Sequence, residues 1–137
     1  MPPKLKVLIL EDFPEDAKLI MFHLTQGGID FDALVVETKE DFEAALDNFI
    51  PDAILCDHSL PQFDSVLALK LLRKRKAYIP FILVTGSVSE EFAVQMIHSG
   101  AHDYIIKDRM TRLPAALMNA MQKCRVENEK IKYLEEL

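Results

Sequence analysis

The sequence predicts a doubly wound α/β domain in which a five-stranded parallel sheet is flanked by five helices. Five short apolar runs recur along the 137 residues, each of the kind that is buried on both faces of a parallel sheet. Segments with helical spacing of apolar residues alternate with these runs. Because parallel neighbours need right-handed crossover connections, this alternation favours helices on both faces of a single sheet.

The first strand is predicted at residues 6–10, a nearly continuous apolar run that ends at Glu11 and Asp12. The helix after it has Pro14 in a position suited to a first turn, and a pair of glycines ends it. Its inward apolar positions are Ala17, Ile20, Met21 and Leu24. A second strand, at residues 31–37, follows this helix.

The middle of the chain repeats the pattern. A helix at residues 40–49, a strand at 53–57, a helix at 65–76 and a strand at 81–85 are predicted in that order. Prolines flank the first of these strands, and Pro80 introduces the second. The inward positions of the two helices are Phe42, Ala45, Leu46, Phe49, Val66, Leu69 and Leu72.

The last third of the chain supplies one more helix, the fifth strand and the final helix. A helix at residues 90–99 is capped by Gly100, and a strand at 103–107 follows. The inward positions of that helix are Ala93, Met96 and Ile97. The final helix is predicted to begin near Arg112 or Leu113.

Helical spacing continues beyond the length that is needed to cover one face of the sheet. It runs through Leu117, Met121, Cys124, Asn128, Ile131 and Leu134. We therefore expect one domain over residues 1–122 and a helical extension over residues 123–137. This extension could form a coiled coil with a second copy of the chain, lead into a downstream helical module, or be a frayed solvated end.

Charge and cysteine usage argue against nucleic acid and membranes as partners and against an oxidising compartment. The net charge is −6, and the densest basic run, residues 73–76, ends a predicted helix, where cations complement the helix dipole. Direct binding of nucleic acid is therefore not expected. The chain shows neither a signal peptide nor a membrane span, and Cys56 and Cys124 lack disulfide or zinc spacing. Reduced thiols, no membrane contact and a cytoplasmic location are expected.

Polar residues lie at the carboxyl ends of four of the predicted strands. They are Glu11, Asp12, Asp57, Thr85 and Lys107. In doubly wound sheets, ligands bind beyond these ends where the strand order reverses. Three carboxylates held close together need a cation, and hard oxygen ligands suit Mg²⁺. In such a site Asp57 could attack a phosphoryl group while Lys107 and Thr85 stabilise its oxygens.

The ordered set extends to further positions: Glu11 and Asp12, Asp57, Pro61, Thr85 and Gly86, Tyr104, and Lys107. Over residues 5 to about 122 this set resembles that of a response-regulator receiver domain of the chemotaxis-regulator type. The resemblance implies a flavodoxin-like fold with strand order 2-1-3-4-5 and a role in two-component signal transduction.

The resemblance also implies the roles of the site residues. Asp57 would take a phosphoryl group from a histidine of a sensor histidine kinase or a histidine phosphotransfer protein. Mg²⁺ would be held by Glu11, Asp12, Asp57 and the backbone carbonyl of Ser59. Thr85 would then move inward and Tyr104 would change rotamer. Such a domain is a signalling phosphoacceptor that assists its own phosphorylation and dephosphorylation, rather than an enzyme.

Other interpretations remain open for single residues and for the whole chain. Asp12 could cap the helix after it, Tyr104 could be core filler, and His58 is expected at the loop surface. A phosphatase of the haloacid dehalogenase type also forms an aspartyl phosphate, but it needs a second acid at the position of Ser59. A flavin binder would meet repulsive acids in the first strand-helix loop. The chain could be a stand-alone regulator or part of a hybrid sensor protein.

Overall fold

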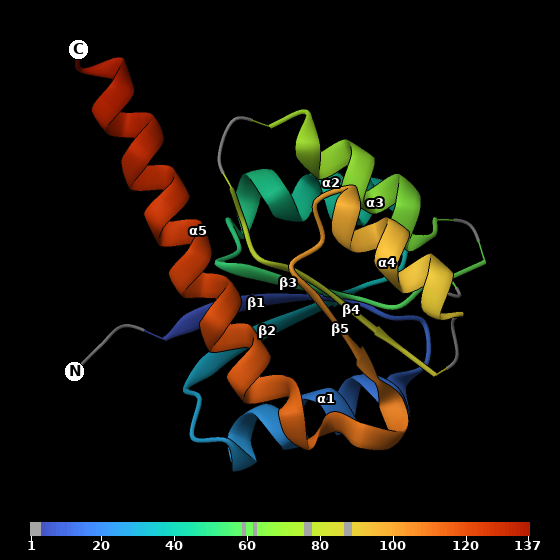
Figure 1. Cartoon of the computed structure of the whole chain (residues 1–137). Helices are drawn as coiled ribbons and strands as arrows, with labels where there is room; N and C mark the ends of the chain where they lie inside the picture. The colour runs from blue at the N-terminus through green and yellow to red at the C-terminus, as the bar shows by residue number, and fades with distance from the viewer. Residues whose placement is uncertain (1–3, 59, 62, 76–77, 87–88) are drawn as a thin grey trace.

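The computed structural model describes residues 4–58, 60–61, 63–75, 78–86 and 89–137, and it confirms the predicted fold. The five parallel strands follow the order β2-β1-β3-β4-β5 (Figure 1). They are β1 (Leu5–Leu10), β2 (Phe31–Val36), β3 (Ala53–Cys56), β4 (Phe81–Thr85) and β5 (Asp103–Ile106). The order reverses between β1 and β3, so the switch point lies where these two strands end.

Five helices cover the two faces of the sheet. On one face lie α1 (Pro14–Gln26) and α5 (Leu113–Glu135), and on the other lie α2 (Lys39–Asn48), α3 (Ser65–Arg73) and α4 (Glu90–His98) (Figure 1). Each face has its own hydrophobic cluster of buried residues. The chain crosses from one face to the other after α1 and returns after α4, so helices cover both faces as in a doubly wound sheet.

The continuous apolar runs are explained by burial on both faces of each central strand. In β1, Val7 and Ile9 join the cluster under α1 and α5, whereas Leu8 and Leu10 join the cluster under α2 and α3. All four side chains are fully buried. Because successive side chains of a strand point to opposite faces, both sets must be apolar.

Three helices start with the side-chain caps that their sequences favour. The hydroxyl of Thr38, the carboxylate of Asp64 and the hydroxyl of Ser89 accept hydrogen bonds from the backbone of the first turn of α2, α3 and α4. The helix α1 differs, because Phe13 stands at its N-cap without a side-chain bond and Pro14 occupies the first turn. Asp12 is therefore not the cap of α1.

Three details differ from the sequence prediction. The helix α3, predicted at residues 65–76, ends at Arg73. Ile97, predicted to point inward, is 40 % exposed, because α4 buries only Ala93 and Met96. A 3₁₀ helix, Lys107–Arg112, joins β5 to α5 and was not predicted, since only Met110 in it is buried and no periodic pattern marks it. The peptide bonds of the described residues are all trans.

The two ends of α5 are held differently. At its start, a Cβ atom at Gly27 would lie 2.3 Å from Pro114 Cγ. The end of α1 therefore approaches α5 so closely that only glycine fits at this position. Near its other end, the amide of Asn128 donates to the carbonyl of Tyr78 and accepts from its N–H, both at 3.0 Å. We call this pair of bonds the Asn128 clamp.

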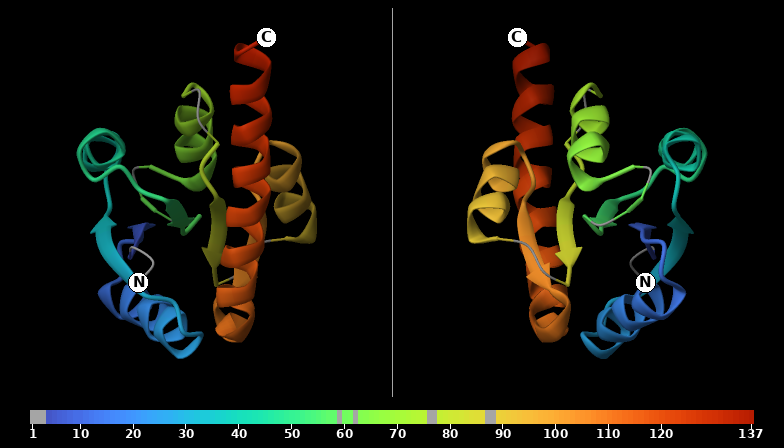
Figure 2. Two further views of the ribbon diagram at one scale, coloured as in Figure 1. Left: turned by 90° about the vertical axis from the view of Figure 1, so that its left-hand side faces the viewer. Right: turned by 90° about the vertical axis from the view of Figure 1, so that its right-hand side faces the viewer.

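Beyond the clamp, α5 reaches past the other helices (Figure 2). Cys124 is buried and Asn128 is bonded to Tyr78, whereas Leu134 is 64 % exposed. Most of the apolar stripe of the extension thus faces its own domain. None of the described helices is long and apolar enough to span a membrane.

Candidate functional site

The carboxylates of the first and third strands meet at the switch point of the sheet. Glu11 follows β1 and Asp57 follows β3, and their exposed fractions are 1 % and 6 %. Asp12 is the more exposed member of the group. One carboxylate oxygen from each of the three lies within 4.8 Å of the others. This is a set of hard oxygen donors at the spacing that a small divalent cation needs.

Lys107, at the end of β5, reaches across the sheet to the same place. Its Nζ lies 2.7 Å from Glu11 Oε1 and 3.1 Å from Asp57 Oδ2. A third carboxylate, Oδ2 of Asp16, also lies 2.7 Å from Nζ. The ammonium has three N–H donors, so each donor has one carboxylate acceptor.

The electrostatics of the site follow from its burial. Burial raises the pKa of Glu11 from 4.5 to about 7; the hydrogen bond from Lys107 opposes this change, and the charge of Asp57 adds to it. Burial alone would lower the pKa of Lys107, but the hydrogen bonds to Asp16 and Glu11 and the charge of Asp57 raise it above its ordinary value. Lys107 is therefore a permanent cation among acids.

Thr85 supplies a hydroxyl at the end of β4. Its side chain is fully buried, and Oγ1 has no hydrogen-bond partner among the described residues. A buried hydroxyl without a partner costs stability, so such an atom usually has a functional reason. Tyr104, in the neighbouring strand β5, is partly buried against the cluster on the face of α2, α3 and α4.

The other residues predicted for the site have mixed outcomes. Ser59 lies outside the described residues, so its carbonyl is not placed. His58, expected at the loop surface, is half-buried: its Nδ1 is 2.8 Å from Ser65 Oγ and its ring packs on Phe92 with centroids 4.2 Å apart. Asp16 was missed, because its contact with Lys107 joins residues that are 91 positions apart. Its place in the first turn of the helix after the acid pair was the only available signal.

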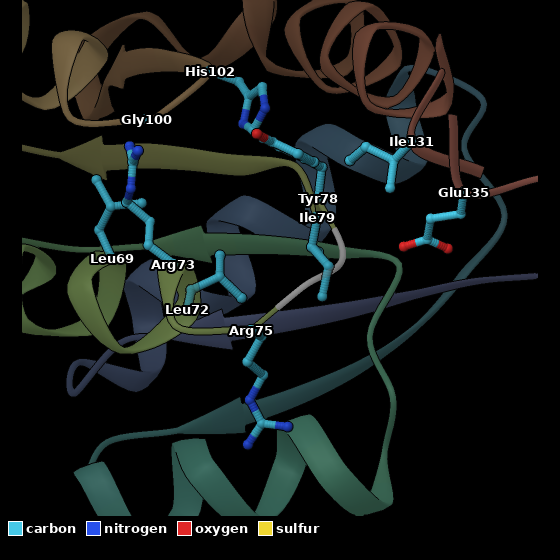
Figure 3. A pocket seen from close by; sticks show the side chains of 10 residues that line it. All are labelled: Leu69, Leu72, Arg73, Arg75, Tyr78, Ile79, Gly100, His102, Ile131 and Glu135. Atoms are coloured by element: carbon cyan, nitrogen blue, oxygen red, sulfur yellow. The ribbon is translucent and has the colours of Figure 1, made fainter. Parts of the chain in front are cut away.

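A pocket of about 410 Å³ lies at the end of the strands opposite to the switch point. It lies between α3, the segment before β4 and the end of α5. Its lining residues are Leu69, Leu72, Arg73, Arg75, Tyr78, Ile79, Gly100, His102, Ile131 and Glu135 (Figure 3). Arg75 points away toward α2, where it pairs with Asp47 at 2.7 Å. No acid of the switch-point group reaches this pocket.

Buried acids, a cross-sheet lysine and a strand-end hydroxyl at the switch point of a 2-1-3-4-5 sheet define a phosphoryl-accepting α/β domain. The family model of the response regulator receiver domain matches residues 7–118. The chain belongs to this family, whose members are signalling domains of two-component systems that generally bind Mg²⁺ at an acidic site.

Known proteins agree with this assignment. The chain is 32 % identical over 123 residues to the luminescence regulatory protein LuxO of Vibrio campbellii. The aligned region covers 88 % of this chain and 27 % of LuxO. It is 40 % identical over 57 residues to the regulatory protein AtoC of Escherichia coli. This aligned region covers 42 % of this chain and 12 % of AtoC. The chain thus spans about a quarter of the first of these relatives.

Solved structures show the same fold. The signal receiver domain of a putative Luxo repressor protein from Vibrio parahaemolyticus superposes with a TM-score of 0.80 at 24 % identity, over 92 % of this chain and 96 % of that one. The receiver domain of the Francisella response regulator 1452 gives a TM-score of 0.74 at 25 % identity, over 88 % of this chain and 98 % of that one.

Proposed function

We propose that Asp57 is the phosphoryl acceptor of this receiver domain and that the donor is a phosphohistidine. The donor protein would be a sensor histidine kinase or a histidine phosphotransfer protein. The observation that carries this proposal is the Asp57 carboxylate at the switch point, beside Glu11 and Asp12 and 3.1 Å from the ammonium of Lys107.

The transfer assigns a role to each of three side chains. An oxygen of Asp57 forms a bond to phosphorus while the P–N bond of the phosphohistidine breaks, and the electron pair remains on the imidazole nitrogen. Lys107 stabilises the phosphoryl oxygens by its charge. The hydroxyl of Thr85, which lacks a partner among the described residues, donates a hydrogen bond to one of these oxygens.

The donor set of the site suits Mg²⁺, because three carboxylate oxygens lie within 4.8 Å of one another and leave room for water ligands. Glu11, Asp12 and Asp57 would hold the ion, together with the carbonyl of Ser59. When bound, the ion neutralises charge that builds up on the phosphoryl group. Between transfers, Lys107 offsets the charge of Glu11 and Asp57.

The phosphoryl group then acts as a switch. It favours the state in which Thr85 reaches it, and the space that Thr85 leaves is available to Tyr104. The output face comprises β5, α4 and α5. The chain would assist its own phosphorylation and dephosphorylation without turning over an external substrate, and it would work in the cytoplasm.

Residues 1–122 form the receiver unit of this proposal, and residues 123–137 form its extension. The extension would lead into a downstream module or pair with a second copy. Support comes from the exposed side chains at its end, Tyr133, Leu134 and Leu137. The relatives are several times longer than this chain, which fits a receiver that is attached to another domain.

Intact-protein mass spectrometry tests the acceptor assignment. With acetyl phosphate and Mg²⁺, the parent chain is expected to gain one phosphoryl group, and Asp57→Asn to gain none, because an amide oxygen is a poor nucleophile. Asp64→Asn is the matched control, since Asp64 only caps α3, and it should be labelled like the parent. Full labelling of Asp57→Asn would disprove the assignment.

A further inference from the structure

Asp16 makes a contact to the reactive site that the set of family residues does not explain. It is the third residue of α1, its side chain is 27 % exposed, and its Oδ2 lies 2.7 Å from Lys107 Nζ. That distance equals the one from Nζ to Glu11 and is shorter than the 3.1 Å to Asp57. Asp16 is thus a full partner of the ammonium.

The four acids of the site divide into two groups. Glu11, Asp12 and Asp57 bring their oxygens within 4.8 Å of one another, and this group, drawn from the described residues, does not include Asp16. Asp16 instead lies in the first turn of α1, where the helix dipole favours a negative charge. The carboxylate of Asp16 is therefore directed to the lysine and not to the cation site.

This division matters when the site is in use. Glu11 and Asp57 have two competing partners, the lysine and the divalent cation, and a phosphorylated Asp57 no longer offers the same carboxylate to Nζ. Among the described carboxylates that contact Lys107, only Asp16 then remains occupied by neither the cation nor the phosphoryl group. An ammonium without it would stay bound to Glu11 and Asp57 and compete with the cation for their oxygens.

We propose that Asp16 is a positioning residue that gives the Lys107 ammonium a partner outside the cation ligands, so that Glu11 and Asp57 can turn to the cation while the ammonium stays ready for the phosphoryl oxygens. This inference rests on the proposed function and adds to it a residue that acts through the lysine. If Asp16 acts through the lysine, its effect on Mg²⁺ affinity depends on the presence of Lys107. If Asp16 acts only through its charge or through the stability of α1, the effect on Mg²⁺ affinity is the same without Lys107.

A double-mutant cycle on Mg²⁺ affinity, measured by calorimetry, separates these cases. Asp16→Asn is expected to weaken Mg²⁺ binding about fivefold when Lys107 is present. In the Lys107→Ala background, the same change should weaken binding no more than Glu15→Gln does. Glu15→Gln is the matched control, because it removes one charge from an exposed position in the same turn.

Two results would overturn the proposal: an equal loss of affinity from Asp16→Asn in both backgrounds, or no loss in either. Asp16→Glu, which keeps the charge, should recover part of the affinity. Labelling of the parent chain by acetyl phosphate is recorded separately. A parent that binds Mg²⁺ but takes up no phosphoryl group would refute the proposed function, while the affinity cycle would still decide the role of Asp16.

Discussion

At the scale of single residues, the site combines groups that are costly to bury. Thr85 Oγ1 is buried without a partner among the described residues, and the carboxyl group of Glu11 is buried between a lysine and a second acid. Each arrangement lowers the stability of the resting domain. The phosphoryl group and a cation would satisfy both groups, so the site is arranged for partners that come from outside the chain.

Thr85→Val tests this trade between stability and function. Valine has nearly the same shape and removes the unpaired hydroxyl, so the free energy of unfolding is expected to rise by about 1 kcal/mol. The stabilisation by Mg²⁺ and beryllofluoride, which mimics the phosphoryl group, should shrink in the same variant. Thermal unfolding with and without beryllofluoride measures both effects.

Thr111→Val is the matched control, because Thr111 is exposed on the 3₁₀ helix and the variant should change neither quantity. A Thr85→Val protein that keeps the whole beryllofluoride effect would exclude the hydroxyl from the switch.

At the scale of elements, the strands were predictable because burial on both faces leaves a continuous apolar run, as in β1 and β4. Helix ends were predictable where a glycine such as Gly100 follows them. The 3₁₀ helix after Lys107 was not, because its course depends on packing and not on a periodic pattern. In α5 the apolar stripe was predicted, but its partner, Tyr78, comes from a distant loop that no local pattern indicates.

A chain that ends at Lys123 tests the role of the extension. It loses Cys124, the Asn128 clamp and Ile131, so its Tm is expected to fall by several degrees. Sedimentation with and without beryllofluoride then shows whether the extension mediates association. If the full chain and the shortened chain associate equally in both conditions, the extension has no part in pairing.

Two asparagine variants separate the clamp from the rest of the extension. Asn128→Ala should cost about 1 kcal/mol, because it removes two hydrogen bonds at a partly exposed position. Asn119→Ala, at an exposed position of the same helix, should cost much less.

At the scale of the whole molecule, the buried acid Glu11 at the switch point couples stability to pH. The folded state raises the pKa of Glu11 from 4.5 to about 7, so the folded chain binds more protons than the unfolded chain in this interval. Stability in the absence of metal must therefore fall as the pH rises from 4.5 to 7. A cation that binds the carboxylates of the folded state would offset the loss.

Glu11→Gln is expected to remove both the fall in stability between pH 4.5 and 7 and the stabilisation by a cation. In EDTA, the drop in Tm from pH 4.5 to pH 7 should be smaller in the variant than in the parent by a few degrees. At pH 8, Mg²⁺ at ten times its dissociation constant should stabilise the parent by about 1.4 kcal/mol. The variant should gain much less.

Thermal unfolding followed by circular dichroism provides both measurements. The exposed Glu15→Gln variant should behave like the parent throughout. A Glu11→Gln protein with the slope of the parent would show that another group is responsible for it.

The position of the Asn128 clamp decides which part of α5 can move. The helix packs on its domain through five buried residues, so this part moves with the sheet: Leu113, Ala116, Leu117, Ala120 and Cys124. With the clamp closed, about 10 Å of helix extends beyond Asn128 to Glu135. With the clamp open, the length beyond the last buried residue, Cys124, is about 17 Å. Two hydrogen bonds to Tyr78 thus set how much of the helix can change direction without disturbing the core.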